Sequence, residues 1–380
     1  MGKKLLFTAS TYSHIHHFHL PYLRHFQEQG WVVHVACGGK PQEIDCADKL
    51  IRLPLEKSMG SPANFRASKQ LRQLIRKEGY DLIITHTSLA AFFTRLAVLG
   101  LSARPPLINM VHGYLFDDDT PFLKRQLLLT AERLTAPCTD LLLTMNDWDY
   151  RTAAQHRLGK QVEYIPGIGV DFSRIRQYSP TSRQAARRKM GVPDDAFVLF
   201  YAAEFSGRKS QDVLIRAMQK LPPHILLILA GDGAQLEHCR ALAKELDLQD
   251  RISFPGYISN IGAWYPLADA AVSSSRSEGL PFNIMEAMYA GLPVIASSVK
   301  GHEDLITDGE TGLLYPYGDA SACAEQILRL AGSANLQQKL SVQGKESVSR
   351  YHLEQVLPTV TAQYKTLLPQ ETEKAAPVQQ

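Results

Sequence analysis

The chain has 380 residues, enough for two domains of roughly 150 to 200 residues that each bury a core of their own. Hydrophobic residues make up 45% and charged residues 21%, which excludes a disordered or fibrous chain. Net charge at pH 7 is +3, and residues 1–170 hold 20 Lys and Arg against 15 Asp and Glu. This small excess falls well short of a nucleic-acid-binding surface but suits an anionic partner, either lipid headgroups or a phosphate-bearing acceptor.

Short apolar runs alternate with helical stretches through the first half of the chain. The runs cover residues 4–9, 31–37, 81–85, 107–111 and 140–145. Runs in which apolar residues do not alternate with polar ones are typical of parallel strands that are covered on both faces. The alternation predicts βαβ units and a doubly wound, Rossmann-like domain over residues 1–170.

The same alternation restarts in the second half. Apolar runs cover residues 196–203, 225–233, 251–256, 269–275, 293–298 and 312–316. They predict a second Rossmann-like domain over residues 171–350, so the fold class is α/β with two doubly wound parallel sheets. Proline, glycine and polar residues between Pro166 and Pro193 place the linker near residues 167–190.

The C-terminal part of the chain reads as helical. Residues 351–368 form a last amphipathic helix, which we expect to pack back towards the first domain. The polar residues 369–380 are predicted to be a disordered tail without chemistry.

The N-terminus and the cysteines indicate a cytoplasmic protein. Residues Met1 to Lys4 lead into a six-residue apolar segment that does not read as a secretory signal, and no apolar run reaches the ~18 residues of a membrane span. The five cysteines are scattered and never form a CxxC pair, which favours reduced thiols that fill space. They are Cys37, Cys46, Cys138, Cys239 and Cys323.

Ligands bind beyond the carboxyl ends of parallel strands, so the segments that follow the strands are the places to search. After the run at 196–203 come Arg208 and Lys209, directly before a helix that starts near Gln211. Two cations beside free helix N–H groups can hold a diphosphate and stabilise its charge as it leaves, although a solvated turn also accounts for such a pair. After the next run, Gly231 and Gly233 form a tight turn that would let a base or ribose approach the backbone, which alone is a weak signal.

The strongest signal lies in residues 273–297. Here a strand ends in a loop that contains Glu278, and Glu286 follows eight positions later in the second turn of a helix that starts near Pro281. Two carboxylates can accept hydrogen bonds from sugar hydroxyls, and an acid beside a nucleotide binds a ribose diol. The same spacing allows a hydrolase acid and base, or two acids at an ordinary helix start. The turn at 301–305 and the pair His112-Gly113 complete the strand-end segments.

At these residues the chain resembles family 4 of the glycosyltransferases over nearly its whole length. The signature is an E-x7-E segment, EGLPFNIME from Glu278 to Glu286, followed by AMYAGLPVIAS and DGETGLLYP. The resemblance implies the GT-B fold, in which two Rossmann-like domains face each other across a cleft. It also implies sugar transfer with retention of the anomeric configuration.

The resemblance implies roles for the matching residues. Glu278 is expected near the donor sugar hydroxyls, Glu286 on the ribose, Lys209 and Arg208 on the diphosphate, and His112, which matches a VHG histidine, over the donor sugar near the reacting carbon. The backbone of the segment between the two acids is expected along the donor. This segment consists of Gly279, Leu280, Pro281, which offers only its carbonyl, and Phe282.

The chain departs from the family pattern at three places. Glu204 stands where the family usually has an arginine, and Ser210 stands for the glycine after the lysine. The glycine-rich first loop is missing, and TASTYSHIHHFHLP stands in its place. We expect His14, His16 and His17 of this segment, with His19, to line the acceptor side.

These observations predict a metal-independent glycosyltransferase of bacterial capsule, exopolysaccharide or cell-surface glycan synthesis. The expected donor is a UDP-hexose or UDP-HexNAc, and the expected acceptor is a glycan or an undecaprenyl-diphosphate-linked sugar. No cofactor is expected, because the leaving diphosphate is stabilised by Lys209 and Arg208 and no enzyme nucleophile is needed.

Two alternatives involve a metal. The acids at 147–149 and at 117–119 resemble the DxD of metal-dependent transferases, but NDWDY equally predicts a capped helix start and DDDTP a capped loop. The histidines of HIHHFH can bind zinc, but no carboxylate or cysteine lies at a suitable spacing and helical windows often place histidine at the surface.

Two further alternatives keep the fold but change the function. A nucleotide-sugar 2-epimerase would act on the donor alone, and a non-catalytic partner subunit would lack the chemistry. The presence of Glu278, Glu286, Lys209 and His112 argues against a non-catalytic subunit. Residues 69–77 and 121–137 combine basic and apolar residues, which suits either peripheral membrane contact or ordinary surface helices on the sheet.

Overall fold

The computed structural model describes residues 2–176 and 179–368, so the predicted disordered tail at 369–380 lies outside the described residues. The chain divides into two compact units. The first unit consists of the residues up to Ile165 together with those from Leu357 onward, and the second extends from Pro166 to Val356. The second unit therefore starts at Pro166, where the sequence prediction had residue 171.

The first unit contains a seven-stranded sheet in the order β3-β2-β1-β4-β5-β6-β7, with every strand pair parallel. The five predicted strands are confirmed, whereas the two edge strands were missed because β3 and β7 are short and largely exposed. The strands are β1 (Lys4–Ala9), β2 (Val32–Cys37), β3 (Lys49–Arg52), β4 (Leu82–His86), β5 (Leu107–Met110), β6 (Leu141–Thr144) and β7 (Gln161–Tyr164).

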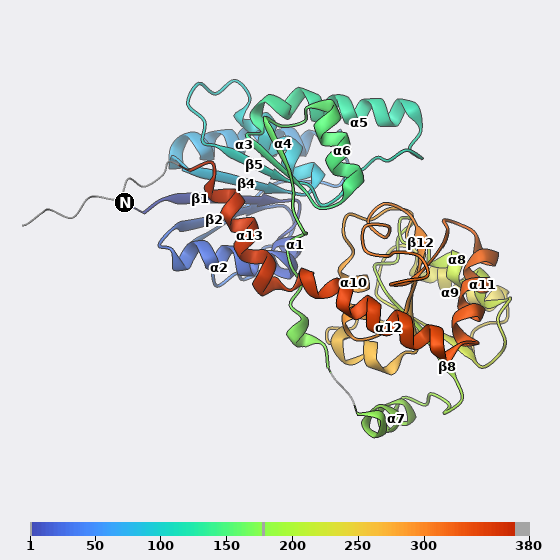
Figure 1. The fold of residues 1–380 in the computed structure, drawn as a ribbon. Coiled ribbons are helices and arrows are strands. Elements are labelled where there is room, and N and C mark those ends of the chain that lie inside the picture. The colour runs from blue at the N-terminus through green and yellow to red at the C-terminus, as the bar shows by residue number, and fades with distance from the viewer. Residues whose placement is uncertain (1, 177–178, 369–380) are drawn as a thin grey trace, which may run out of the picture. The chain divides into compact units, whose positions relative to one another are not determined.

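Helices cover both faces of this sheet (Figure 1). Successive residues of a strand point to opposite faces, so each strand contributes side chains to the core on both sides. Leu6 packs in one core cluster with residues of α3 and α4, whereas the Phe7 ring contacts Phe26 of α2. Tyr364 of α13 stacks on Phe26 with ring centroids 6.1 Å apart. The helices are α1 (Tyr12–Phe18), α2 (Leu20–Glu28), α3 (Pro62–Glu78), α4 (Ser88–Val98), α5 (Phe122–Thr135), α6 (Asp147–His156) and α13 (Leu353–Lys365).

The second unit contains a six-stranded parallel sheet in the order β10-β9-β8-β11-β12-β13. All six predicted strands are confirmed. They are β8 (Phe197–Ala202), β9 (Ile225–Ala230), β10 (Ile252–Gly256), β11 (Ala270–Ser273), β12 (Val294–Ser298) and β13 (Leu313–Pro316).

Helices also cover both faces of the second sheet. Leu199 and Tyr201 pack into a core with α8, α9 and α11, whereas Phe200 contacts Trp264 and Tyr265 on the other face. The helices are α7 (Pro180–Lys189), α8 (Gln211–Met218), α9 (Leu236–Glu245), α10 (Phe282–Tyr289), α11 (Ala320–Ala331) and α12 (Ala334–Val348).

Helix α7 lies in the segment that was predicted to be a linker, so the linker prediction is wrong for residues 180–189. Arg183 and Arg187 of this helix both form ion pairs of 2.8 Å with Asp269. The segment is polar because arginines anchor it. It therefore lacks the apolar periodicity by which a helix is predicted from sequence.

Both sheets reverse their strand order next to their first strand. The reversal falls between β1 and β4 in the first unit and between β8 and β11 in the second. Loops that leave such a pair of strands diverge to opposite sides, which opens a crevice where ligands bind in doubly wound sheets. The prediction of two doubly wound α/β domains is confirmed, and the two switch points direct the search for a site.

Candidate active site

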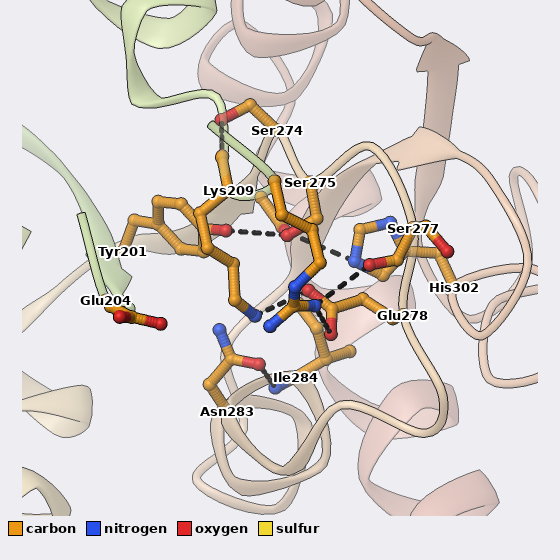
Figure 2. Close-up of polar contacts among 12 residues, drawn as sticks. Tyr201, Glu204, Lys209, Ser274, Ser275, Ser277, Glu278, Asn283, Ile284 and His302 are labelled. Carbon is orange, nitrogen blue, oxygen red and sulfur yellow. Dashed lines mark hydrogen bonds and ion pairs between the residues drawn. The ribbon is translucent and has the colours of Figure 1, made fainter. Parts of the chain in front are cut away.

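Arg208, Lys209 and Glu278 form a charged cluster at the switch point of the second sheet (Figure 2). The Lys209 ammonium donates to one oxygen of the Glu278 carboxylate at 2.5 Å. The Arg208 guanidinium donates to the other oxygen at 2.8 Å and to the Ser277 carbonyl at 2.9 Å. The structure thus brings together three residues that the sequence predicted for the donor site, and it pairs them with one another.

Backbone contacts hold the two loops of this cluster against each other. The Ser274 hydroxyl donates to the Lys209 carbonyl at 3.0 Å, and the Arg276 N–H donates to the Arg208 carbonyl at 2.8 Å. One loop follows β8 and the other follows β11, so the neighbouring strands of the switch point carry one residue set each. The fold therefore fixes the charges in place before any ligand binds.

Glu278 is ionised in this environment. Burial raises the pKa of its carboxyl group, but the charges of Lys209 and Arg208 outweigh burial and lower the pKa to about 2. Two cations around one carboxylate leave a net positive charge. An entering anion is attracted by that charge and can take over donors that Glu278 now occupies.

Ser210 adopts the left-handed backbone conformation, with φ of 47°. This conformation favours glycine, which explains in physical terms why a glycine is common at this position of the resembling family. The Ser210 hydroxyl is bonded to the Gly207 carbonyl and to the Tyr317 hydroxyl, both at 3.0 Å. These contacts help to hold a serine in a conformation that a side chain disfavours.

Gly231 and Gly233 have a packing role in the structure. A Cβ atom on Gly231 would lie 2.0 Å from the Ala203 carbonyl oxygen, and one on Gly233 would lie 2.4 Å from the Phe205 carbonyl oxygen. Both also have positive φ angles, 140° and 148°. The close approach of the loop after β8 is by itself a sufficient reason for both glycines.

Glu286 lies apart from the charged cluster in its contacts. It occupies the second turn of α10, as predicted, and its carboxylate accepts a hydrogen bond of 2.9 Å from the Tyr265 hydroxyl. Burial raises its pKa to about 7, although the Tyr265 hydrogen bond and the charge of Arg174 act in the opposite direction. At neutral pH this carboxyl group is therefore divided between its protonated and ionised forms.

The segment between the two acids leads into α10. Leu280 is buried, Pro281 occupies the cap position and Phe282 is the first helical residue. The Asn283 amide donates to the Ala202 carbonyl at 3.0 Å, which ties the start of the helix to the end of β8. The predicted donor-binding backbone thus lies beside the strand that carries Lys209 in its loop.

His302 was not among the predicted site residues, although its turn was noted as a strand-end segment. Its ring is fully buried and contacts the Ser273 hydroxyl at 3.1 Å and the Ser297 carbonyl at 2.8 Å. Next to it, a Cβ atom on Gly301 would lie 2.8 Å from the Glu278 Cβ atom. The turn after β12 therefore packs directly on Glu278 and fixes its position.

Glu204 is exposed and lies outside the ion pairs of the charged cluster (Figure 2). Its carbonyl accepts a hydrogen bond of 2.9 Å from the Gln211 side chain. The backbone of Glu204 thus supports the start of α8.

Four histidines of the first unit form an imidazole cluster, consisting of His14, His19, His86 and His112. His14 and His19 approach with their Nε2 atoms 3.2 Å apart, and His86 Nδ1 lies 3.2 Å from His112 Nε2. The rings come from α1 and its junction with α2 after β1, from the end of β4 and from the segment after β5. The cluster therefore lies at the switch point of the first sheet.

The imidazole cluster is uncharged. Burial, followed by the mutual repulsion of the rings, lowers the pKa of His19, His86 and His112 well below the usual value. Burial lowers the pKa of His14 to about 4. His112 is thus a neutral imidazole near neutral pH, and its ring nitrogens offer one lone pair and one proton.

The histidines of the N-terminal segment separate by helix face. His16 and His17 are exposed. His19 is fully buried, and His14 is only partly exposed. Helical geometry explains the difference, since His19 follows the buried Tyr12 and Ile15 at seven and four positions and so lies on the same face, whereas His16 and His17 lie on the other.

The acids that resemble DxD segments have structural partners. Asn146 caps α6 and accepts the Asp149 N–H at 2.8 Å, which confirms the capped helix start. Asp149 is buried, and its carboxylate accepts a hydrogen bond of 2.6 Å from the Asn146 amide. Asp118 accepts a hydrogen bond from Trp148 at 2.7 Å and forms an ion pair of 3.0 Å with Arg125.

Two family models match this chain. The model described as glycosyl transferases group 1 matches residues 182–347, and the model described as a glycosyl transferase 4-like domain matches residues 20–167. Together they cover most of both units.

Relatives match along most of the chain. A protein of Bacillus subtilis (strain 168) that is named "Putative glycosyltransferase EpsD" is 35% identical over 356 residues, which cover 92% of this chain and 93% of the relative. An Escherichia coli UDP-Gal:alpha-D-GlcNAc-diphosphoundecaprenol alpha-1,3-galactosyltransferase is 23% identical over 270 residues, or 68% of each chain.

A solved structure shares the fold. Anabaena Alr3699/HepE in complex with UDP and glucose has a TM-score of 0.79 and 19% identity, and the match covers 96% of this chain and all of HepE. The shared fold extends over both units.

Proposed function

Because this chain belongs to the family 4 glycosyltransferases of the GT-B fold, we propose that it transfers a sugar from a UDP-sugar to a glycan or lipid-linked acceptor with retention. The observation that carries this proposal is the charged cluster of Arg208, Lys209 and Glu278 at the switch point of the second sheet. A net positive site at the carboxyl ends of parallel strands suits the diphosphate of a nucleotide-sugar.

The reaction breaks the bond between the anomeric carbon of the donor and the UDP oxygen, which leaves with the electron pair. Lys209 and Arg208 stabilise the charge that grows on the diphosphate. The acceptor hydroxyl forms the new bond to the anomeric carbon on the same face and gives its proton to the departing phosphate oxygen. Glu278 then holds the donor sugar hydroxyls.

Glu286 supplies a second carboxylate for the donor. Its ionised form can accept hydrogen bonds from both hydroxyls of a ribose, and Tyr265 orients it at 2.9 Å. Gly279, Leu280 and Phe282 contribute backbone N–H groups along the donor. The UDP found in the HepE structure supports the choice of base, and UDP-hexose or UDP-HexNAc are the donors we propose.

The proposed acceptor is a growing bacterial surface glycan or an undecaprenyl-diphosphate-linked sugar. The E. coli relative acts on a diphosphoundecaprenol-linked sugar, and this name supports the lipid-linked class for the present chain. His14, His16 and His17 are the side chains we assign to the acceptor side.

Transfer on this reading needs no divalent metal ion on the diphosphate, because side-chain cations occupy that role. Activity should therefore survive an excess of EDTA. Loss of transfer in EDTA that is restored by Mg²⁺ or Mn²⁺ would contradict this part of the proposal.

Helix α5 supports an association with an anionic membrane surface. Phe122, Leu123 and Leu127 are 72%, 82% and 71% exposed, and Lys124 and Arg125 lie on the same helix. Exposed apolar side chains beside cations suit the interface of an anionic bilayer. No helix in the described part of the chain is long and apolar enough to span a membrane.

Flotation tests this association. The protein should co-float with vesicles that contain anionic lipid, and Leu123→Ser with Leu127→Ser should abolish co-flotation. Leu328→Ser, at a side chain of the second unit that is 42% exposed, is the matched control and should change nothing. Failure of the unaltered protein to co-float would remove the membrane from the proposal.

A donor screen followed by a transfer assay tests the proposed function. Thermal shift with a panel of UDP- and GDP-sugars should identify one UDP-sugar that stabilises the chain, and that donor should label a lipid-linked or glycan acceptor. Absence of stabilisation by every UDP-sugar would contradict the donor assignment. Conversion of UDP-GlcNAc to ManNAc and UDP without an acceptor would instead favour the epimerase.

A further inference from the structure

We propose that the imidazole cluster of the first unit is a binding site for a late first-row transition-metal ion, with His14, His19 and His112 as its ligands. The ion has no step in the proposed transfer reaction, so this inference does not depend on the proposed function. It revises the expectation, drawn from the spacing of the N-terminal histidines, that these residues bind no metal.

The positions of the ring nitrogens carry the proposal. One ring nitrogen from each of the three histidines lies within 4.8 Å of the other two. His14 Nε2 and His19 Nε2 are 3.2 Å apart, which is close to the ~3.3 Å between two nitrogens on one tetrahedral Zn²⁺ with bonds of about 2.0–2.1 Å. The widest pair is at most 4.8 Å apart, and rotation of the rings that brings its two nitrogens about 1.5 Å closer gives the same spacing.

The sequence alone missed this site because its ligands come from distant segments. His14 and His19 flank a helix junction after β1, whereas His112 follows β5. Because the strands are parallel, both segments follow the same ends of their strands, the carboxyl ends of β1 and β5. The third ligand is therefore supplied by another strand, and no carboxylate or cysteine is needed near the first two.

The ligand set selects the class of metal. Three neutral imidazoles without a carboxylate suit Zn²⁺, Cu²⁺, Ni²⁺ or Co²⁺, whereas Mg²⁺, Ca²⁺ and Mn²⁺ prefer oxygen ligands. Among the described residues, this is the one group of three or more His, Cys, Asp or Glu side chains with metal-binding spacing.

The site is rigid on one side and accessible on the other. His19 and His86 are fully buried, whereas His14 and His112 are partly exposed and can admit an ion from solvent. Three protein ligands leave a fourth position for water, as in catalytic rather than structural zinc sites.

The metal-free arrangement is not fully satisfied. His19 Nδ1 and His86 Nε2 are buried and have no hydrogen-bond partner among the described residues. Each 3.2 Å pair of ring nitrogens must also share a single proton. A bound ion takes up the facing lone pairs of His14 and His19 together with a ring nitrogen of His112, so the close His14–His19 pair no longer has to share a proton.

Cobalt and zinc titrations of the full chain test the site. The protein is prepared without an affinity tag of histidines, stripped with a chelator and titrated with Co²⁺ under a visible-absorption readout. We expect one Co²⁺ per chain with the intense absorption of tetrahedral coordination, and its loss when Zn²⁺ is added. Calorimetry gives the affinity for Zn²⁺ directly.

Variants separate this site from adventitious binding. His14→Ala and His112→Ala should each weaken Zn²⁺ binding by at least ~100-fold, since loss of a ligand exceeds the loss of an outer-shell partner. His17→Ala, an exposed histidine of the same helix as His14, is the matched control and should bind as the unaltered chain does. Circular dichroism confirms that each variant is folded.

The proposal is overturned by either of two results. One is an unaltered, folded chain that binds no Co²⁺ or Zn²⁺. The other is metal binding that survives His14→Ala and His112→Ala, or that His17→Ala removes, because the ion would then be held elsewhere. Neither result bears on sugar transfer in metal-free buffer, which is measured separately.

Discussion

The two units place different chemistry at the same topological position. In the second unit, the switch point between β8 and β11 holds Arg208, Lys209 and Glu278, three charged groups joined by ion pairs. In the first unit, the switch point between β1 and β4 holds a cluster of neutral imidazoles. The imidazole cluster of the first unit is uncharged and offers nitrogen lone pairs, whereas the charges of the second unit's cluster are already joined in ion pairs.

This difference separates what the fold decides from what the residues decide. A doubly wound sheet opens a crevice where the strand order reverses, whatever side chains line it. Side chains then set the charge of the ligand that binds. Arg208 and Lys209 can exchange Glu278 for another anion, whereas neutral imidazoles can bind a cation. The comparison predicts that each cluster can be disabled without disturbing the other.

Removal of the buried lysine should have the largest effect on transfer. Lys209→Met should lower the rate of transfer by roughly 10² to 10³-fold, because the charge on the leaving diphosphate loses one of its two proposed cations. The rate is measured at saturating donor with a fixed acceptor. Lys220→Met, at an exposed lysine of the same unit, should leave the rate unchanged.

A second variant separates catalysis from folding. Lys209→Met leaves the buried Glu278 carboxylate with Arg208 as its remaining cation and should also lower the melting temperature. The double variant Lys209→Met with Glu278→Gln should recover the melting temperature without recovering transfer. Recovery of both would show that Lys209 acts through stability alone.

The sequence predicted these charged residues, but not their mutual contacts. The strand ends were predictable because buried parallel strands are apolar on both faces, and the loops that follow them carry Lys209, Glu278 and His112. The ion pairs were not predictable, since they join loops 69 residues apart. Sequence spacing placed Glu278 and Glu286 in one site, whereas the structure gives them different partners and pKa values shifted in opposite directions.

Each part that sequence analysis missed was missed for a physical reason. Edge strand β7 and helix α7 are polar because they are exposed or anchored by arginines, so they lack an apolar period. The imidazole cluster joins residues that are far apart along the chain, so their spacing in the sequence does not reveal it. His302 was overlooked because a single buried histidine in a turn has no pattern of its own.

Zinc should inhibit transfer by acting at the first unit. A metal ion held by His14 occupies a ring nitrogen of a side chain that the proposed function assigns to the acceptor side. At a free Zn²⁺ concentration ten times the dissociation constant, the rate should fall about tenfold. In His14→Ala the same zinc concentration should leave that variant's own rate nearly unchanged, and equal inhibition of both proteins would place the inhibitory ion elsewhere.

The affinity for the donor should depend on pH through Glu286. The ionised carboxylate accepts hydrogen bonds from the ribose, and its pKa of about 7 in the free protein means that affinity rises with pH. We expect about a threefold gain between about pH 6.5 and about pH 7.5, measured by calorimetry with an intact UDP-sugar, whose diphosphate does not titrate there. Glu286→Gln should remove this dependence.

The same group should make folding stability depend on pH in the opposite direction. Its pKa is raised above the ordinary value of 4.5, so its contribution to stability is fully present below that value and is lost as pH rises through about 7. Urea unfolding across this window should show the loss in the unaltered chain and not in Glu286→Gln. A contribution of the same slope in both proteins would assign it to another group.

The smallest expected effect concerns the shape of the charged loop rather than its charge. Ser210 has φ of 47°, where a residue with a Cβ atom is disfavoured by roughly 1–2 kcal/mol relative to glycine. Ser210→Ala loses both hydroxyl contacts and keeps that strain, whereas Ser210→Gly loses the contacts and relieves the strain. The glycine variant should therefore be more stable than the alanine variant by about 1 kcal/mol in urea unfolding. An alanine variant as stable as the glycine variant would mean that the backbone at Ser210 relaxes freely, and the loop would then not be fixed before the donor binds.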